Sequence, residues 1–80
     1  MIDVHVAFFA ILREQTGAGE LTIQTSTDNV GALFDELRQR YPALQRFSTM
    51  KFAINDRLVQ ADAPIAQDDR VLFFPPVAGG

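Results

Sequence analysis

The sequence has no cysteine and only one histidine, His5, among its 80 residues. Without cysteine there can be no disulfide, no thiolate metal ligand and no thiol nucleophile. A single histidine does not supply the ligand set that a zinc site requires. We therefore predict no metal site. The absence of cysteine does not indicate in which redox compartment the protein works.

Clustered positive charge and a long apolar run are also missing. Seven Lys and Arg residues stand against ten Asp and Glu residues, for a net charge of -3, and the basic residues are scattered. Nucleic-acid binding needs a basic patch, so no nucleic-acid partner is expected. The apolar run VAFFAIL has seven residues, too few to cross a bilayer, and lacks the flanks of a signal peptide. We expect a cytoplasmic protein without membrane contact.

The residues that are present fit one small globular domain. Hydrophobic residues make up 48% of the chain and charged residues 21%, as in ordinary soluble proteins. A chain of this length buries about 60% of the surface that its unfolded form exposes, so it folds without a second domain. We predict a folded domain over residues 1–74 and an extended tail over residues 75–80.

Alternating apolar residues predict five strands. In residues 1–9 the alternation puts Ile2, Val4, Val6 and Phe8 on one face and His5 on the other, where a solvated or edge side chain is expected. The other predicted strands are residues 20–25, 51–55, 57–59 and 70–74. Asn55 and Asp56 predict a turn between the third and fourth of these strands.

Residues 26–42, STDNVGALFDELRQRYP, predict the main helix. Polar residues at its start offer N-cap oxygens, and Pro42 ends it. Apolar side chains at three- and four-residue spacing form one stripe that we expect to face a sheet: Val30, Leu33, Phe34, Leu37 and Tyr41. Residues 10–19 predict a short helical turn, and an irregular stretch is expected around residues 43–47.

One helix on a mixed sheet of four or five strands predicts an α+β fold of the ubiquitin-like β-grasp type. The first and last strands are strongly apolar, so we expect them to be central and parallel. A ferredoxin-like sandwich has the same element order. That fold needs a second helix over the sheet, and the stretch between Pro42 and Lys51 is too short to supply a good one.

The body of the domain offers a binding surface rather than an active site. Asp68 and Asp69 form a polar turn with no third group to orient them as a catalytic pair. If Phe8 and Phe73 face the helix, Phe9 and Phe74 face the opposite side of the sheet, and Leu58 joins them there. An open aromatic pair of this kind usually marks an interface. The alternative is that residues 42–50 cover these rings.

The last eight residues, FFPPVAGG, predict a chemically active end. Pro75 and Pro76 fix φ and lack N–H groups, so the chain must leave the sheet as a stiff extended segment. Gly79 and Gly80 have no Cβ, which suits a narrow channel in a partner and leaves the terminal carboxylate open to attack. A carboxylate becomes a good electrophile as an acyl-adenylate, so we predict activation by a partner enzyme that holds ATP and magnesium.

Four motifs together resemble one known family: FFPPVAGG at the end, FFAILRE near the start, NVGALFDEL in the helix, and AIN before RLV. They resemble the small subunits of molybdopterin synthase, the MoaD branch of the MoaD/ThiS ubiquitin-like sulfur carriers. The resemblance covers the whole chain. The FFPPV-x-GG ending is specific, whereas Gly-Gly alone is a weak signal.

The resemblance implies that an E1-like enzyme adenylates Gly80 and that a sulfur donor enzyme converts it to a thiocarboxylate. The large subunit of the synthase then uses this sulfur to build the dithiolene of molybdopterin from cyclic pyranopterin monophosphate, in molybdenum cofactor biosynthesis. Phe9, Leu58 and Phe74 match family positions that contact the large subunit. The resemblance also implies that the tail inserted into the partner consists of Pro75, Pro76, Val77, Ala78 and Gly79. The chain would bind no cofactor and would be the sulfur-donating subunit of a sulfurtransferase, not an enzyme by itself.

The chain departs from the family sequence in one turn, and three alternative functions remain open. Relatives often have Gly-Asp-Glu where this chain has Asp68, Asp69 and Arg70. Asp tolerates a left-handed turn, so the fold is expected to survive, but the reversed charge at Arg70 leaves any partner contact there open. The alternatives are a sulfur carrier for thiazole or another sulfur metabolite, a ubiquitin-like modifier joined to lysines, and a binding module with an inert tail.

Overall fold

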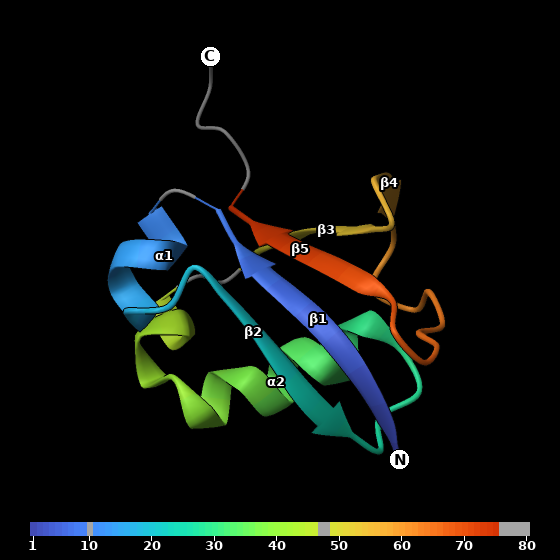
Figure 1. The fold of residues 1–80 in the computed structure, drawn as a ribbon. Helices are drawn as coiled ribbons and strands as arrows, with labels where there is room; N and C mark the ends of the chain where they lie inside the picture. Colours follow the sequence, from blue (N-terminus) through green and yellow to red (C-terminus); the bar gives the residue numbers. More distant parts are fainter. Residues whose placement is uncertain (10, 47–48, 76–80) are drawn as a thin grey trace.

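The computed structural model describes residues 1–9, 11–46 and 49–75, which form one sheet and its covering helices (Figure 1). In chain order the elements are β1 (Ile2–Phe8), α1 (Ile11–Thr16), β2 (Glu20–Thr25), α2 (Val30–Arg40), the 3-10 helix η1 (Pro42–Arg46), β3 (Lys51–Ile54), β4 (Arg57–Val59) and β5 (Arg70–Phe74). The predicted strands and main helix are confirmed.

The sheet has five strands in the order β2-β1-β5-β3-β4. β1 pairs with β5 in parallel, and the other neighbouring pairs are antiparallel. The expectation of a central, parallel first and last strand is therefore confirmed. Because β1 and β5 run in the same direction, their carboxyl ends lie at the same end of the sheet (Figure 1).

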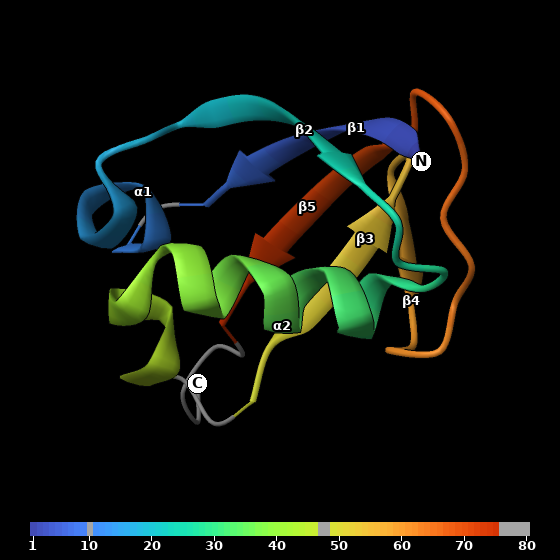
Figure 2. The ribbon, with the colours of Figure 1, turned by 90° about the horizontal axis from the view of Figure 1, so that it is seen from below.

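One face of the sheet is covered by α2, which runs across it in Figure 2. Asn29 caps this helix, with its side-chain oxygen accepting the Ala32 N–H at 2.8 Å. The buried residues of α2 are Val30, Leu33, Phe34 and Leu37. The ferredoxin-like alternative is wrong, because in the described part of the chain α2 alone spans the sheet.

Phe73 lies at the centre of the core and is fully buried. Its ring centroid lies 5.2 Å from that of Phe34, 5.6 Å from that of Phe52 and 6.2 Å from that of Phe8. β5, the middle strand, thus carries the aromatic contact between the sheet and α2.

The stretch predicted to be irregular after the main helix contains η1, so that prediction is wrong for residues 43–46. Proline fits the first position of a helical turn because its missing N–H has no partner to lose there. Leu44 is fully buried, and its N–H donates to the Tyr41 carbonyl at 2.9 Å. Burial of Leu44 under α1 and α2 therefore makes this segment regular.

Two turns use left-handed backbone at non-glycine residues. Asn55 and Asp56 have φ values of 50° and 70° and form the predicted tight turn between β3 and β4. Asp68 has a φ of 67° in the turn before β5. The expectation that Asp tolerates a left-handed conformation there is confirmed. Among the described helices, none is long and apolar enough to span a membrane.

Candidate functional site

The sheet face opposite α2 carries three rows of side chains, which the strand register sets. The middle row crosses all five strands and consists of Glu20, Ala7, Leu72, Ala53 and Leu58. The row toward the start of β5 consists of Thr22, His5 and Arg70. The row toward the end of β5 consists of Phe9, Phe74 and Lys51.

The apolar part of this face is exposed. Phe9 is 51% exposed and Leu58 is 76% exposed, and both stand out among the large apolar residues of the described chain. Phe9 and Phe74 lie edge to face, with ring centroids 6.5 Å apart, and Phe74 is half-buried. The outward orientation predicted for Phe9, Leu58 and Phe74 is confirmed, while their role in partner binding stays a prediction. We call these three residues and Leu72 the apolar patch.

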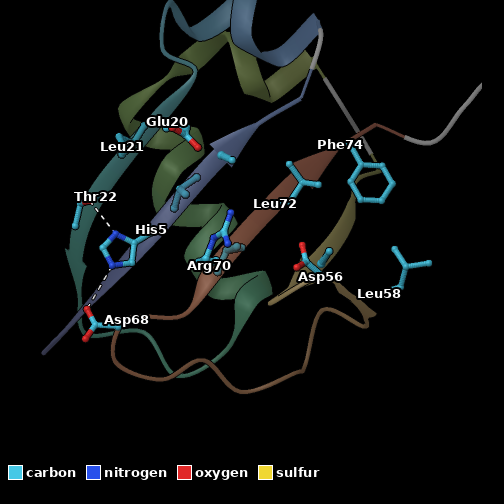
Figure 3. Close-up of a pocket in the computed structure, with 14 residues that line it drawn as sticks. His5, Glu20, Leu21, Thr22, Asp56, Leu58, Asp68, Arg70, Leu72 and Phe74 are labelled. Atoms are coloured by element: carbon cyan, nitrogen blue, oxygen red, sulfur yellow. Dashed lines mark hydrogen bonds and ion pairs between the residues drawn. The ribbon is translucent and has the colours of Figure 1, made fainter.

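A shallow groove runs through the middle row. Ala7 and Ala53 have the smallest side chains of that row, and they flank Leu72 on the neighbouring strands. Phe74 and Leu58, which have larger side chains, line the same groove (Figure 3). Alternating small and large side chains give a hollow into which a bulky apolar side chain of another molecule would fit.

Residues 42–50 do not cover the patch as far as they are described. η1 packs against α1 and α2, with Leu44 in the core, and Met50 packs against the core as well. The predicted alternative of a covering loop therefore has no support from residues 42–46 and 49–50.

The polar side of the face is held by a hydrogen-bonded group around His5. Nδ1 of His5 lies 3.1 Å from Thr22 Oγ1, and Nε2 lies 3.3 Å from Asp68 Oδ1 (Figure 3). The His5 side chain is 46% exposed on an inner strand, so it is solvated, as predicted, and not at a sheet edge. His5 joins β1 to β2 and to the turn before β5.

Nothing in the described residues has the geometry of an active site. Asp69 accepts hydrogen bonds from the Ala66 N–H at 2.8 Å and from the Asn55 side-chain amide at 3.0 Å. Its carboxylate therefore stabilises the turn before β5. Within the described ranges no three His, Cys, Asp or Glu side chains gather as metal ligands, and every buried polar side-chain atom has a partner.

The patch lies where the C-terminal segment begins. The Phe9 N–H donates to the Phe73 carbonyl at 3.3 Å, which extends the β1–β5 ladder by one residue beyond β1. β5 ends at Phe74, and Pro75 follows it, half-buried. The predicted functional residues of the tail lie outside the described residues: Pro76, Val77, Ala78, Gly79 and Gly80.

Sequence reasoning missed part of this surface. It named Phe9, Leu58 and Phe74 but not Leu72, although two-residue alternation from Phe74 places Leu72 on the same face. It also missed the hollow at Ala7 and Ala53, because that feature depends on the register between strands, which the sequence does not state.

A five-stranded sheet with a parallel central pair, one crossing helix and an open apolar face defines a ubiquitin-like β-grasp protein built to present that face. Residues 6–80 match the model of the ThiS family, and the chain belongs to that family. The predicted resemblance to the MoaD/ThiS sulfur carriers is thereby confirmed.

Several relatives with known names are similar to this chain. The chain is 37% identical, over the full length of both proteins, to the molybdopterin synthase sulfur carrier subunit of Mycobacterium tuberculosis. A putative molybdopterin converting factor subunit 1 from Pyrococcus furiosus has a similar structure, with a TM-score of 0.85 and 26% identity over 96% of this chain and 100% of that one. Small archaeal modifier protein 1 from Methanosarcina acetivorans superposes with a TM-score of 0.83 and 26% identity, over 100% of this chain and 98% of that one.

Proposed function

We propose that the chain is the sulfur carrier subunit of a molybdopterin synthase, with its C-terminal glycine as the sulfur-bearing residue. The observation that carries this proposal is that β5 ends in the apolar patch at Phe74 and the Pro-Pro-Val-Ala-Gly-Gly segment follows directly. A protein docked on the patch would receive the C-terminus. The full-length similarity to a curated sulfur carrier subunit supports the same function.

The chemistry proceeds at the Gly80 carboxylate in three steps. A carboxylate oxygen attacks the α-phosphorus of ATP, held with magnesium by an E1-like enzyme, and pyrophosphate leaves. Sulfide sulfur from a donor enzyme then attacks the acyl carbon, and AMP leaves, which converts the carboxylate to a thiocarboxylate. In the large subunit the thiocarboxylate sulfur bonds to a carbon of the pterin precursor, cyclic pyranopterin monophosphate, and displaces an oxygen substituent there. Water then cleaves the bond between the sulfur and the Gly80 acyl carbon, which returns Gly80 to a carboxylate for the next cycle.

The chain itself contributes the surface that binds the large subunit and a tail that extends to the receiving site. The large subunit covers Phe9, Leu58 and Phe74, and an apolar side chain of that subunit fills the hollow beside Leu72. Gly80 is five residues beyond Pro75. A fully extended chain of that length spans at most about 18 Å, so the receiving site lies within that distance of Pro75. The absence of Cβ atoms at Gly79 and Gly80 lets the tail enter a narrow passage.

The remaining assignments follow from this role. The partners are the large subunit, the E1-like adenylating enzyme and the sulfur donor enzyme, and the chain works in the cytoplasm, where those reactions take place. It binds no cofactor itself, because ATP and magnesium belong to the activating enzyme. In the synthase it is the subunit that donates sulfur.

A second candidate function is protein modification. The observation that favours it is the structural similarity to small archaeal modifier protein 1. Adenylation of Gly80 is common to both functions. They differ in the nucleophile that follows, which is sulfur for a carrier and a lysine amine of a target for a modifier.

The test exploits the missing cysteines. A thiocarboxylate at Gly80 would be the one strongly nucleophilic sulfur of the chain, since Met1 and Met50 are thioethers that react slowly near neutral pH. Protein produced with its activating enzyme and sulfur donor should gain the mass of one sulfur in place of one oxygen. It should also take one iodoacetamide equivalent, at the C-terminal peptide.

The matched control is a variant with one residue added after Gly80, which keeps the folded domain and should neither gain sulfur nor label. Incubation of the wild-type carrier with the large subunit and pterin precursor should remove the label site. An unlabelled C-terminus despite proven adenylation contradicts the carrier function, and adducts to lysines of other proteins would favour the modifier.

A further inference from the structure

Arg70 places a positive charge beside the apolar patch. It is the first residue of β5 and pairs with His5 across the parallel ladder, so its side chain stands on the open face (Figure 3). It lines the same groove as Leu72 and Phe74, the two residues that follow it on that face of β5. A partner seated on the patch would therefore also lie over the guanidinium group.

The base of the Arg70 side chain is rigid. The Arg70 N–H donates to Asn55 Oδ1 at 3.0 Å, and the Arg70 carbonyl accepts the Asn55 N–H at 2.8 Å. The Asn55 amide also donates to Asp69. Since the N–H and the carbonyl of Arg70 are both bonded to Asn55, the backbone that carries the side chain is fixed, and less conformational freedom is lost when a partner engages the guanidinium.

The neighbouring carboxylates are occupied by other donors. Asp68 contacts His5 and accepts from the Gln67 side-chain amide at 3.2 Å, and Asp69 accepts from Ala66 and Asn55. Ion pairs within 4.0 Å among the described residues join His5 to Asp68 and Arg38 to Asp35. Neither includes Arg70. Asp56 also lines the groove, and it takes part in neither of these two ion pairs.

An exposed arginine without an ion pair is well solvated until a partner covers it. Covering it removes water from the charge, and an uncompensated buried charge costs more free energy than the surrounding apolar contact returns. A carboxylate on the partner compensates the charge and, with the planar guanidinium, forms two parallel hydrogen bonds of defined geometry. A partner with a basic or neutral group at this point would be rejected.

We propose that the protein bound on the apolar patch presents a carboxylate to Arg70, and that this ion pair determines which large subunit the carrier accepts. The apolar patch supplies the contact area, while Arg70 fixes orientation and selects the partner. This inference rests on the proposed function, because it takes the large subunit of molybdopterin synthase as the bound protein.

Titration calorimetry with the purified large subunit from the same organism tests the ion pair. Arg70→Glu should raise Kd at least about 30-fold, because like charges would then meet at the interface. Arg70→Met, which keeps an unbranched apolar stem but not the charge, should raise Kd about 10-fold, and Arg70→Lys should lose less affinity than Arg70→Met.

The matched control is Arg57→Glu, the same charge reversal on neighbouring β4. Arg57 is exposed and pairs with the core-facing Ile54, so it lies off the open face. Its Kd should stay within about 2-fold of wild type. Asp56→Asn tests whether Arg70 pairs within its own chain instead. That variant should bind as well as wild type or better, since removal of Asp56 takes a like charge away from the partner's carboxylate.

The outcomes separate this inference from the function on which it rests. If Phe74→Ala weakens binding and Arg70→Glu does not, the partner presents no carboxylate and the inference is overturned while the function stands. An Asp56→Asn variant that loses affinity as strongly as Arg70→Met also overturns it. If the wild-type carrier does not bind the large subunit at all, the function and the inference fall together.

Discussion

Phenylalanine has opposite environments on the two faces of the sheet, buried on one and partly exposed on the other. Phe8 and Phe73 are 2% and 0% exposed on the face that α2 covers, while their sequence neighbours Phe9 and Phe74 stand on the open face, Phe9 with 51% of its surface exposed. Strand side chains alternate between faces, so each Phe-Phe pair is divided between the core and the surface. Adjacent residues thus serve folding and, under the proposed function, binding.

The covered face is the more densely connected of the two. Phe73 lies close to three other phenylalanine rings, and Phe8 has Tyr41 as a further edge-to-face neighbour at 5.9 Å. On the open face the aromatic contact is the pair of Phe9 and Phe74. The covered face has already used its apolar area for folding, whereas the open face keeps apolar area that none of the described residues buries.

The largest expected effect is therefore on the covered face. Phe73→Ala should lower the free energy of unfolding by roughly 3 to 5 kcal/mol, because it removes the centre of the aromatic core and leaves a cavity. Denaturant unfolding measures this change. Phe73→Leu keeps much of the volume and should cost less than about 1.5 kcal/mol. A Phe73→Ala protein as stable as wild type would show that the core does not depend on this ring.

Phe74→Ala, one residue later, should have the opposite profile. Its main effect should be a loss of about 2 kcal/mol or more in binding to the large subunit, as expected for an aromatic anchor, with a much smaller loss in unfolding free energy. Titration calorimetry and denaturant unfolding of the same preparation give both numbers. If the loss fell on stability and spared binding, the division between the two faces would not hold at this position.

Most of this division could be predicted from the sequence, because it depends on local rules. Two-residue alternation placed Phe9 and Phe74 outward, and Asn55 and Asp56 predicted the tight turn. Both properties arise within a few consecutive residues. The central, parallel position of the first and last strands followed from their apolar character and is also confirmed.

Apart from Leu72, which local alternation places on the open face, the features that were missed depend on residues far apart in the chain. η1 is regular because Leu44 is buried by α1 and α2, and no local pattern states that contact. The bonds of His5 join it to Thr22 and Asp68, which are 17 and 63 residues away. Such contacts need the strand register and the topology first. The roles of residues 76–80 stay predictions from the motif and the family.

The smallest expected effects come from two neighbours on the edge strand β4, and they sharpen the comparison most. Leu58 is exposed on the open face opposite Ala53, whereas Val59 pairs with Phe52 and packs against the core. Leu58→Ala should cost about 1 kcal/mol of binding and less than about 0.5 kcal/mol of stability, since little of its surface is buried before a partner arrives. Val59→Ala should cost about 1 kcal/mol of stability and leave binding unchanged, since it removes methyl groups from the half-buried rim of the core. The two variants delete aliphatic side chains from consecutive residues of one strand, so differences in edge position or local backbone do not separate them. Equal effects on binding would mean that the partner contacts the edge of β4 itself and not the open face.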